Sequence, residues 1–248
     1  MLPTSTPAVR NDYVTSIADT KPLIRAAQRL RYRVFAQELG ARLDTPVGGH
    51  DVDAFDDLAE HLIVTERTTG EVVGTHRLLP PGRPRGSYAE TEFDLRGLLP
   101  VRSSMIEVGR SCVHPGHRGG AVIGLLWAGT ARYALLSGRR YLGGCASVPL
   151  DDGGRAASAA WLASATAYMA PGGLRVRPHR PWVPRGPGAA APGHAALPPR
   201  LRGYAHLGAR VCGAPAHDPQ FGVADFFVLL DMDRLNRRYR RYLLGETR

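Results

Sequence analysis

The amino-acid sequence predicts an α/β domain with a mixed, largely antiparallel central sheet flanked by helices. Segments typical of helices alternate with segments typical of strands along most of the chain. The first two strands are expected as a hairpin, which argues against a purely parallel, doubly wound sheet. We expect residues 1–20 to be polar and irregular. Residues 21–248 are expected to form one domain that contains a loop rich in proline, glycine and arginine at about 171–202.

Hydrophobic spacing indicates the first helix and the hairpin. Leu23, Ala27 and Leu30 recur at intervals of three and four residues, which places them on one face of a helix that Gly40 is expected to end. The stretches HLIVTE and EVVGTHRLL are typical of strands and are joined by the polar turn RTTG. The later elements follow the same rules. Strands are expected over 104–115, 141–148 and 222–232, and helices over 121–137, 155–169 and 233–244.

Composition limits the classes of function. The 248 residues carry a formal net charge of +10, which comes from arginine, because Lys21 is the single lysine. Such a surplus indicates an acidic partner, although an arginine-rich composition alone produces the same charge. Three widely spaced cysteines suit neither a zinc site nor a disulfide framework. With no signal-like segment, no long apolar run and no nucleic-acid-binding pattern, we expect a cytoplasmic protein that does not bind nucleic acid.

The stretch IEVGRSCVHPGHRGG is typical of a strand that turns into a helix. Free backbone N–H groups at the start of a helix attract phosphate oxygens, and Arg118 adds a positive charge there. A glycine turn is also common where no ligand binds. Glu107 and Arg110 interrupt the strand, and they share one face only if a bulge at Gly109 lies between them.

Several blocks in the same order resemble one branch of the GNAT acyltransferases. They are RYRVFAQELGA, DAFDDLAEHLIV, VVGTHRLLP, IEVGRSCVHPGHR, YLGGCAS, LPPRLRGYAHLGARV and FGVADFFVLLDMDRLNRRY. The branch contains the ornithine N-acyltransferases of ornithine-lipid synthesis, the acyl-homoserine-lactone synthases and the long-chain N-acyl amino acid synthases. The resemblance implies a GNAT-like fold and transfer of a 3-hydroxyacyl chain from acyl carrier protein to the α-amino group of an amino acid, most of all ornithine. Acyl-CoA is the other co-substrate it allows, and no permanent cofactor or metal is expected.

The resemblance also assigns residues. The R-x-x-x-F, D-x-x-D and E-x-x-R patterns of the homoserine-lactone synthases, with their arginine before Leu-Leu-Pro, match Arg31 and Phe35, Asp53 and Asp56, Glu107 and Arg110, and Arg77. The donor turn maps to Val113, Arg118, Gly119 and Gly120, without the exact spacing of the usual Arg/Gln-x-x-Gly-x-Gly/Ala pattern.

Chemistry gives these residues roles. Amide formation needs a neutral amine, so a base must take its proton, and Glu107 is the candidate. Asp53 and Asp56 could hold the side-chain ammonium of ornithine, with its carboxylate on Arg77 or Arg31. Arg110 is placed with Glu107 in catalysis or in an ion pair with Asp53 or Asp56. Two further side chains complete the substrate site: Phe35 as core or acyl-pocket wall, and Ser147 as a hydrogen-bonding group.

Alternatives stay open at this point. The acceptor could be another amine, and a non-enzymatic basic binding protein is the third hypothesis. A covalent route through Cys112 and His114 is disfavoured, because direct transfer needs no acyl-enzyme. A homoserine-lactone synthase is disfavoured, because the tryptophan expected after R-x-x-x-F is replaced by Gly40-Ala41. The basic segment 233–244 could contact carrier protein or, peripherally, the inner face of an anionic membrane, and a solvated face of a C-terminal helix explains its arginines equally well.

Overall fold

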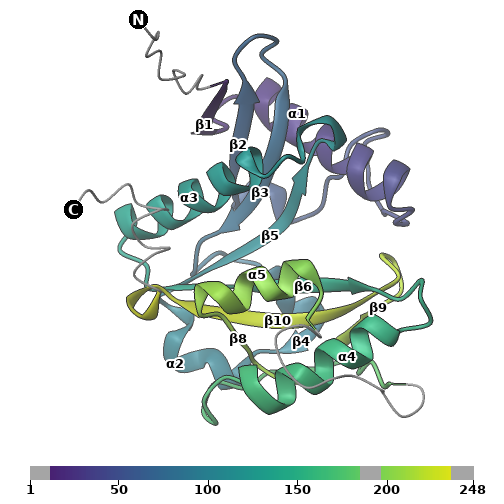
Figure 1. The fold of residues 1–248 in the computed structure, drawn as a ribbon. Coiled ribbons are helices and arrows are strands. Elements are labelled where there is room, and N and C mark those ends of the chain that lie inside the picture. Colours follow the sequence, from purple (N-terminus) through teal and green to yellow (C-terminus); the bar gives the residue numbers. More distant parts are fainter. Residues whose placement is uncertain (1–11, 185–196, 236–248) are drawn as a thin grey trace, which may run out of the picture.

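The computed structural model describes residues 12–184 and 197–235. Its main sheet has the strand order β1-β2-β3-β5-β6-β10-β8, and β9 also pairs with β10 (Figure 1). Among the described strand pairs of this sheet, β5 and β6 are parallel and the others are antiparallel, which confirms the mixed, largely antiparallel sheet. The strands are β1 (Tyr13–Ile17), β2 (Glu60–Glu66), β3 (Val72–Leu79), β5 (Met105–Val113), β6 (Tyr141–Pro149), β8 (Arg210–Val211), β9 (Ala216–Asp218) and β10 (Val223–Asp231), with β4 (Phe93–Asp94) and β7 (Arg177–Pro178) in a separate pair.

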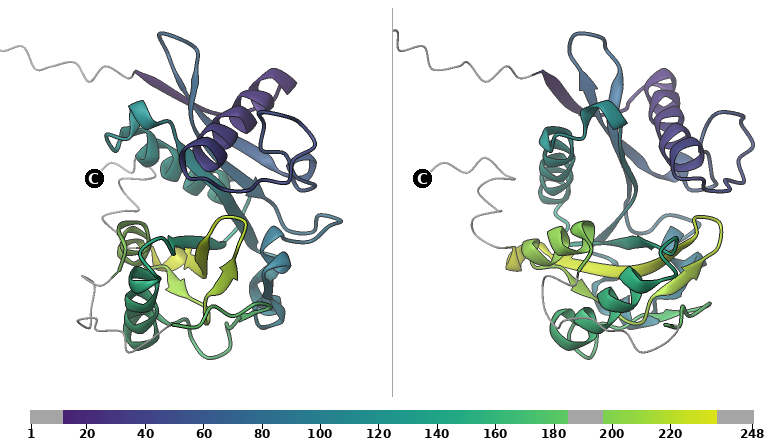
Figure 2. Two further views of the ribbon diagram at one scale, coloured as in Figure 1. Left: turned by 90° about the vertical axis from the view of Figure 1, so that its right-hand side faces the viewer. Right: turned by 45° about the vertical axis from the view of Figure 1, so that its right-hand side comes forward.

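Helices cover both faces of the sheet. Helices α1 and α3 lie on opposite faces of the half formed by β1, β2, β3 and β5 (Figure 2). Alternation along β2 explains this, because Ile63 packs in the α1 core while Leu62 and Val64 pack in the α3 core. Within the described ranges, every helix is too short or too polar to cross a lipid bilayer. The helices are α1 (Lys21–Tyr32, continued by a π-helix over Arg33–Glu38), α2 (Leu99–Arg102), α3 (Ala121–Leu136), α4 (Arg155–Ala163) and α5 (Pro199–Leu207).

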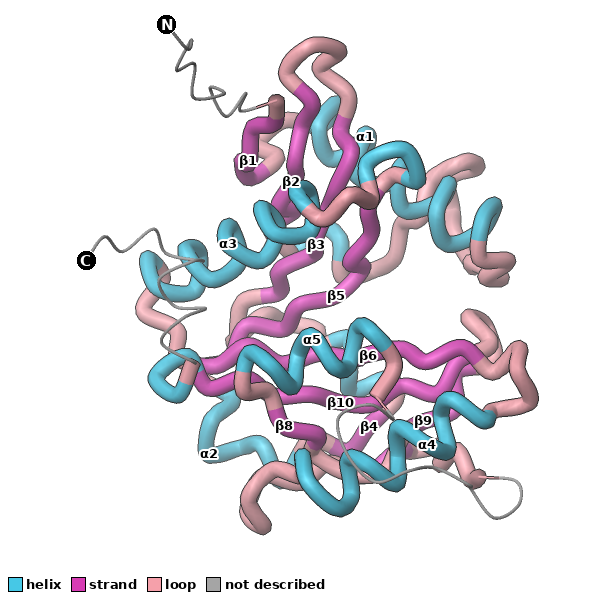
Figure 3. Tube along the Cα trace, viewed as in Figure 1, coloured by secondary structure: helices cyan, strands magenta, loops and turns pink. Residues whose placement is uncertain are grey.

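The other half of the sheet, β6, β10, β8 and β9, also has a core on each face. Phe226 packs with Ala160 of α4 and Leu201 of α5, whereas the next residue, Phe227, packs with Phe93 and the segment around α2. Helices α4 and α5 lie beside β10 and β6 in the tube trace (Figure 3). This half therefore has residues of one strand alternately facing two apolar layers, as a sheet covered on both sides requires.

One expectation about irregular segments is wrong. Residues 13–17 are not irregular but form β1, an edge strand paired with β2. Its half-buried, alternating pattern gives a weak hydrophobic signal. The expected loop at 171–202 contains β7 and the start of α5, and its residues 185–196 lie outside the described ranges. The helix expected over 233–244 also falls largely outside them, and residues Met232–Arg234 form a 3₁₀ turn.

The parallel strands β5 and β6 separate soon after they meet. The two strands pair at three positions, of which Glu107 opposite Gly143 is the last. Beyond this point the two strands diverge, and backbone groups that would pair within a sheet face the space between them. Gly144 lies at the fork, where a Cβ atom would come within 2.2 Å of the backbone oxygen of Val108. The fork therefore requires a glycine on β6.

This close approach leads to a stability prediction. Gly144→Ala is expected to lower the free energy of unfolding by about 1–3 kcal/mol, because the methyl group must push the backbone of β5 away. Gly109→Ala is the matched control on the facing strand, since nothing lies within 4 Å of a Cβ there. Urea unfolding of both variants measures the difference. Equal losses in the two variants would show that the contact with Val108 does not matter.

Candidate active site

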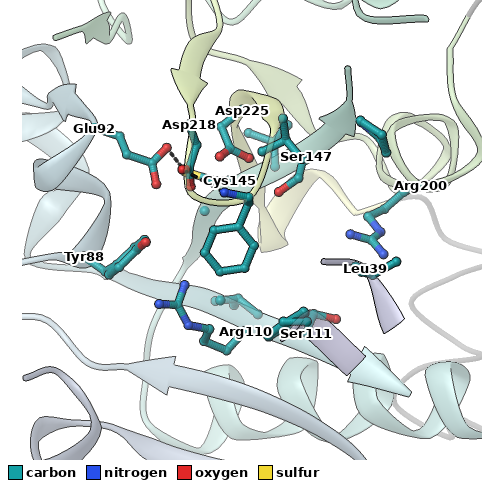
Figure 4. A pocket seen from close by; sticks show the side chains of 18 of the residues that line it. Leu39, Tyr88, Glu92, Arg110, Ser111, Cys145, Ser147, Arg200, Asp218 and Asp225 are labelled. Atoms are coloured by element: carbon teal, nitrogen blue, oxygen red, sulfur yellow. Dashed lines mark hydrogen bonds between the residues drawn. The ribbon is translucent and has the colours of Figure 1, made fainter. Parts of the chain in front are cut away.

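A cavity of about 1050 Å³ opens where β5 and β6 diverge. One part of the cavity wall, which we call the apolar branch, contains Trp127 of α3 and Tyr204 of α5. Their rings meet edge to face, with centroids 5.2 Å apart. Another part of the wall, which we call the charged branch, carries charged and polar groups, including Tyr88, Arg110 and three carboxylates (Figure 4). Of the residues that the sequence assigns to the site, the cavity wall includes Phe35, Arg77, Arg110 and Ser147, whereas Arg31, Asp53, Asp56, Glu107, Val113, Arg118, Gly119 and Gly120 lie outside it.

Behind this wall, arginines and aspartates form a buried ionic network. Arg31 is fully buried and binds Asp51 through Nε at 2.8 Å and Asp56 through both terminal nitrogens at 2.9 and 2.8 Å. Arg77 Nη1 lies 2.6 Å from Asp53 Oδ1 and 3.2 Å from Asp56 Oδ1. Burial alone would raise the pKa of Asp56, but the bonds and charge of Arg31 hold it well below its ordinary value. The loop that carries the aspartates is thereby fastened to α1 and β3.

Arg110 reaches this network from a β-bulge. The register between β3 and β5 shifts between Thr75 and Arg77, so that two β5 residues stand opposite one residue of β3. Arg110 has φ +48°, a left-handed backbone conformation that residues other than glycine rarely adopt. Its guanidinium lies 3.1 Å from both Asp51 and Asp53, and 4.6 Å from the ring centroid of Tyr88. The bulge expected at Gly109 is present one residue later, and it turns Arg110 into the cavity.

Glu107 lies one layer behind the cavity wall. Its carboxylate accepts hydrogen bonds from the Ser87 hydroxyl and from the backbone N–H of Ala89, the latter at 3.1 Å. Burial raises the pKa of Glu107, although these two hydrogen bonds oppose the shift. Because Tyr88 lies between the two donors and lines the cavity, Glu107 fixes the turn that presents it. No hydrogen bond or ion pair joins Glu107 to Arg110 among the described contacts.

The expected donor turn lies at the start of α3. Gly120, with φ +98°, occupies the N-cap position, and no side chain caps this 16-residue helix. Arg118 is half-exposed and forms a bidentate ion pair with Glu38, and its Nε donates to the Val113 carbonyl at 3.2 Å. Phosphate binding by this turn stays a prediction. Cys112 packs in the α1 core, where burial raises its pKa to about 12, and this suits a structural thiol.

The charged branch ends in three carboxylates that the sequence analysis missed. Glu92, Asp218 and Asp225 come from three separate segments, and oxygens of all three lie within 4.8 Å of one another (Figure 4). Burial, followed by the charges of Asp225 and Asp218, raises the pKa of Glu92. Burial and the charge of Asp218 also raise the pKa of Asp225. One sequence signal was available, since Asp225 interrupts the apolar strand VADFFVLL.

These raised pKa values predict a pH-dependent stability. A carboxyl whose pKa is higher in the folded state stabilises fully only below its ordinary pKa of about 4, and this stability is lost as the pH rises. Asp225→Asn should therefore gain melting temperature relative to the wild type, and the gain should grow as the pH rises from about 4 to about 7, through the raised pKa of Asp225. Calorimetric scans of both proteins without ligand test this. A difference that stays constant over that range would contradict it.

Comparisons with known proteins relate the chain to acyltransferases. The chain is 32% identical over 251 residues to an L-ornithine N(alpha)-acyltransferase from Brucella abortus (strain 2308), with 93% of this chain and 88% of the relative covered. It is 33% identical over 247 residues to an L-ornithine N(alpha)-acyltransferase from Rhodobacter capsulatus, with 93% and 94% covered. A family model described as an acetyltransferase (GNAT) domain matches residues 30–128.

Solved structures show the same fold. A CoA-dependent acyl-homoserine lactone synthase, BjaI, solved with SAM and isopentyl-CoA, superposes with a TM-score of 0.56 at 19% identity over 90% of this chain and 81% of that one. FeeM, an N-acyl amino acid synthase from uncultured soil microbes, gives 0.55 at 14% identity over 93% and 94%. The GNAT-like fold is confirmed, and the hypothesis of a non-enzymatic binding protein is wrong. The chain is an acyltransferase and belongs to the family of the L-ornithine N(alpha)-acyltransferases.

Proposed function

We propose that the enzyme transfers a 3-hydroxyacyl chain from acyl carrier protein to the α-amino group of ornithine, a step of ornithine-lipid synthesis. The observation that carries the proposal is the single cavity at the fork of β5 and β6, which joins an apolar branch to a charged branch. An acyl chain suits the first branch and a zwitterionic amino acid suits the second. The names of the relatives support ornithine as the acceptor.

The strand fork suits the thioester. Val108 and Gly109 of β5 and Gly144 of β6 line the cavity where the two strands no longer pair. A pantetheine arm laid between the strands would meet backbone groups of both. The acyl chain would then enter the apolar branch between Trp127 and the residues of α5. A net charge of +10 suits an acidic carrier protein, and the basic segment 233–244 proposed for carrier or membrane contact lies largely outside the described residues.

The reaction needs one proton acceptor. The neutral α-amine attacks the thioester carbonyl, the carbon–nitrogen bond forms, and the carbon–sulfur bond breaks. Glu107, through water, takes the proton that the nitrogen loses in this proposal, and the same proton is returned to the leaving thiolate, which becomes the free thiol. The raised pKa of Glu107 suits a base that works near neutral pH. Arg77 and Arg110, which both line the cavity, are the proposed partners of the acceptor carboxylate.

A product assay by mass spectrometry tests the proposal. The purified enzyme is incubated with 3-hydroxyacyl carrier protein and a mixture of free amino acids and amines, and then with the same acyl chain on CoA. We expect N-acylornithine as the main product, formed faster from carrier protein than from CoA. A different acylated amine as the main product would favour the alternative of another acceptor. Equal rates from both thioesters would remove carrier protein from the proposal, and no acyl transfer from either donor would contradict it altogether.

A further inference from the structure

The proposed mechanism assigns no role to the three carboxylates of the charged branch. Glu92 comes just before β4, Asp218 ends β9, and Asp225 lies on β10. All three line the cavity, and Figure 4 shows them converging on one side of it, with Arg110 across the space. Neighbouring strands hold two of them in place, because Asp218 pairs with Val223 two residues before Asp225. The group is therefore a fixed part of the cavity wall.

The three acids have no cationic ion-pair partner in the part of the chain that the structure describes. No arginine or lysine within residues 12–184 or 197–235 forms an ion pair with any of the three. Arg110, the cation across the cavity, is already paired with Asp51 and Asp53. By contrast, the aspartates of the buried network, Asp53 and Asp56, are held by two arginines each. The group of Glu92, Asp218 and Asp225 is therefore the acidic part of the cavity wall that has no arginine or lysine partner among the described residues.

Asp225 gives a second and separate indication of a ligand. The residue is 3% exposed and its carboxyl group lies beside Ser147 and Glu92, but within the described residues its Oδ1 atom has no hydrogen-bond partner of normal geometry. A buried carboxylate oxygen without a partner is costly, and such atoms are rare unless a ligand supplies the missing donor. Figure 4 shows this carboxylate directed toward Glu92 and Asp218 rather than away from the cavity. A cationic donor entering the cavity would satisfy the Oδ1 atom and balance the charge of the group together.

We propose that Glu92, Asp218 and Asp225 form the subsite for the side-chain ammonium of a dibasic amino acid acceptor. An ammonium group has three N–H donors, which match three carboxylate acceptors. The α-amine must lose its proton to react, and a cage of carboxylates stabilises the charged form of an amine. The group therefore suits the amine that is not acylated. It holds the distal nitrogen charged and non-nucleophilic, so that transfer occurs at the α-position. This inference rests on the proposed function, because it takes the acceptor to be an amino acid.

Discrimination between two acceptors of similar shape tests the subsite. Norleucine carries a methyl group where ornithine carries its side-chain ammonium. The wild type should have a kcat/KM for ornithine about 10- to 100-fold above that for norleucine, as expected for charge-assisted hydrogen bonds. Asp225→Asn and Glu92→Gln should each remove most of this preference, because each raises the KM for ornithine far more than the KM for norleucine. Asp233→Asn, an exposed acid outside the cavity wall, is the matched control.

The outcomes separate the two proposals. A wild type that acylates no amino acid overturns the proposed function, and calorimetric binding of ornithine to the wild type and to Asp225→Asn then tests the subsite alone. Binding that is lost in the variant supports the subsite, and binding that is absent or unchanged overturns it. An ornithine-to-norleucine ratio that survives both substitutions also overturns it. The subsite is overturned as well if CaCl₂ or MgCl₂ raises the melting temperature of the wild type but not that of Asp225→Asn. The carboxylates would then form a metal site.

Discussion

Replacing Arg31 by methionine is expected to lower the free energy of unfolding by about 3–5 kcal/mol. The substitution leaves Asp51 and Asp56 buried, each with one of its two arginine partners gone. Arg31 supplies three of the short contacts to their carboxylates. The loss comes from the uncompensated charges rather than from the missing attraction between the ions. Urea unfolding followed by circular dichroism measures the effect.

Arg33→Met is the matched control, only two residues along the same helical segment. The Arg33 side chain is 54% exposed, and its ion pair with Glu71 is long, at 4.0 Å. Exposed pairs of this kind contribute at most about 1 kcal/mol. If both variants lose the same free energy, the buried network does not fasten the 51–56 loop. A double variant in which Asp56 is also replaced by asparagine should recover part of the loss at Arg31, since the network then has two aspartates for its two remaining arginines instead of three.

Glu107→Gln is expected to lower kcat by about 10²- to 10⁴-fold, the usual contribution of a general base. Glutamine keeps the size of the side chain, and its amide oxygen can still accept from Ala89. A normal unfolding curve for the variant is therefore expected. Single-turnover acylation of ornithine, monitored from about pH 6 to about pH 9, measures the effect, and the loss of the acidic limb of the pH–rate profile would be the signature of a missing base.

Ser87→Ala separates the two roles that the structure allows for Glu107. This variant removes one hydrogen bond from the carboxylate but leaves the carboxylate itself. If Glu107 is the base, Ser87→Ala should retain most of its turnover. If Glu107 acts by holding the turn with Tyr88, both variants should lose similar activity and keep the acidic limb. Full turnover of Glu107→Gln would contradict the base assignment, and the carboxylates that line the cavity would become the candidates.

Much of the fold could be predicted, because its hydrophobic patterns are strong and local. The hairpin β2–β3 and the strand β10 carry clear strand patterns, and α3 is apolar along its length. The edge strand β1 could not be predicted in this way, because alternate residues of YVTSI face solvent. The turn to a π-helix after Tyr32 depends on tertiary packing, and no local pattern indicates it.

The site could be predicted in part. Resemblance identified Arg77 and Arg110, which line the cavity, and Arg31, Asp53 and Asp56, which support it from behind. The substrate contacts assigned to these residues stay predictions. The carboxylate group could not be recognised from the sequence, because Glu92 is far along the chain from Asp218 and Asp225. Acids in turns usually look like solvated loop residues, and only the sheet pairing brings these three together.

The conformation of Arg110 has a consequence for how this enzyme can change. A left-handed arginine costs about 1–2 kcal/mol, and its ion pairs with Asp51 and Asp53 offset that cost. Neither aspartate lines the cavity. If the loop that carries them shifted, the bulge would be free to relax to ordinary strand geometry, and the guanidinium would swing away from its place in the cavity wall. The direction of a side chain inside the site is thus governed from a loop outside it, so new acceptor preferences can arise there without any substitution in the cavity wall.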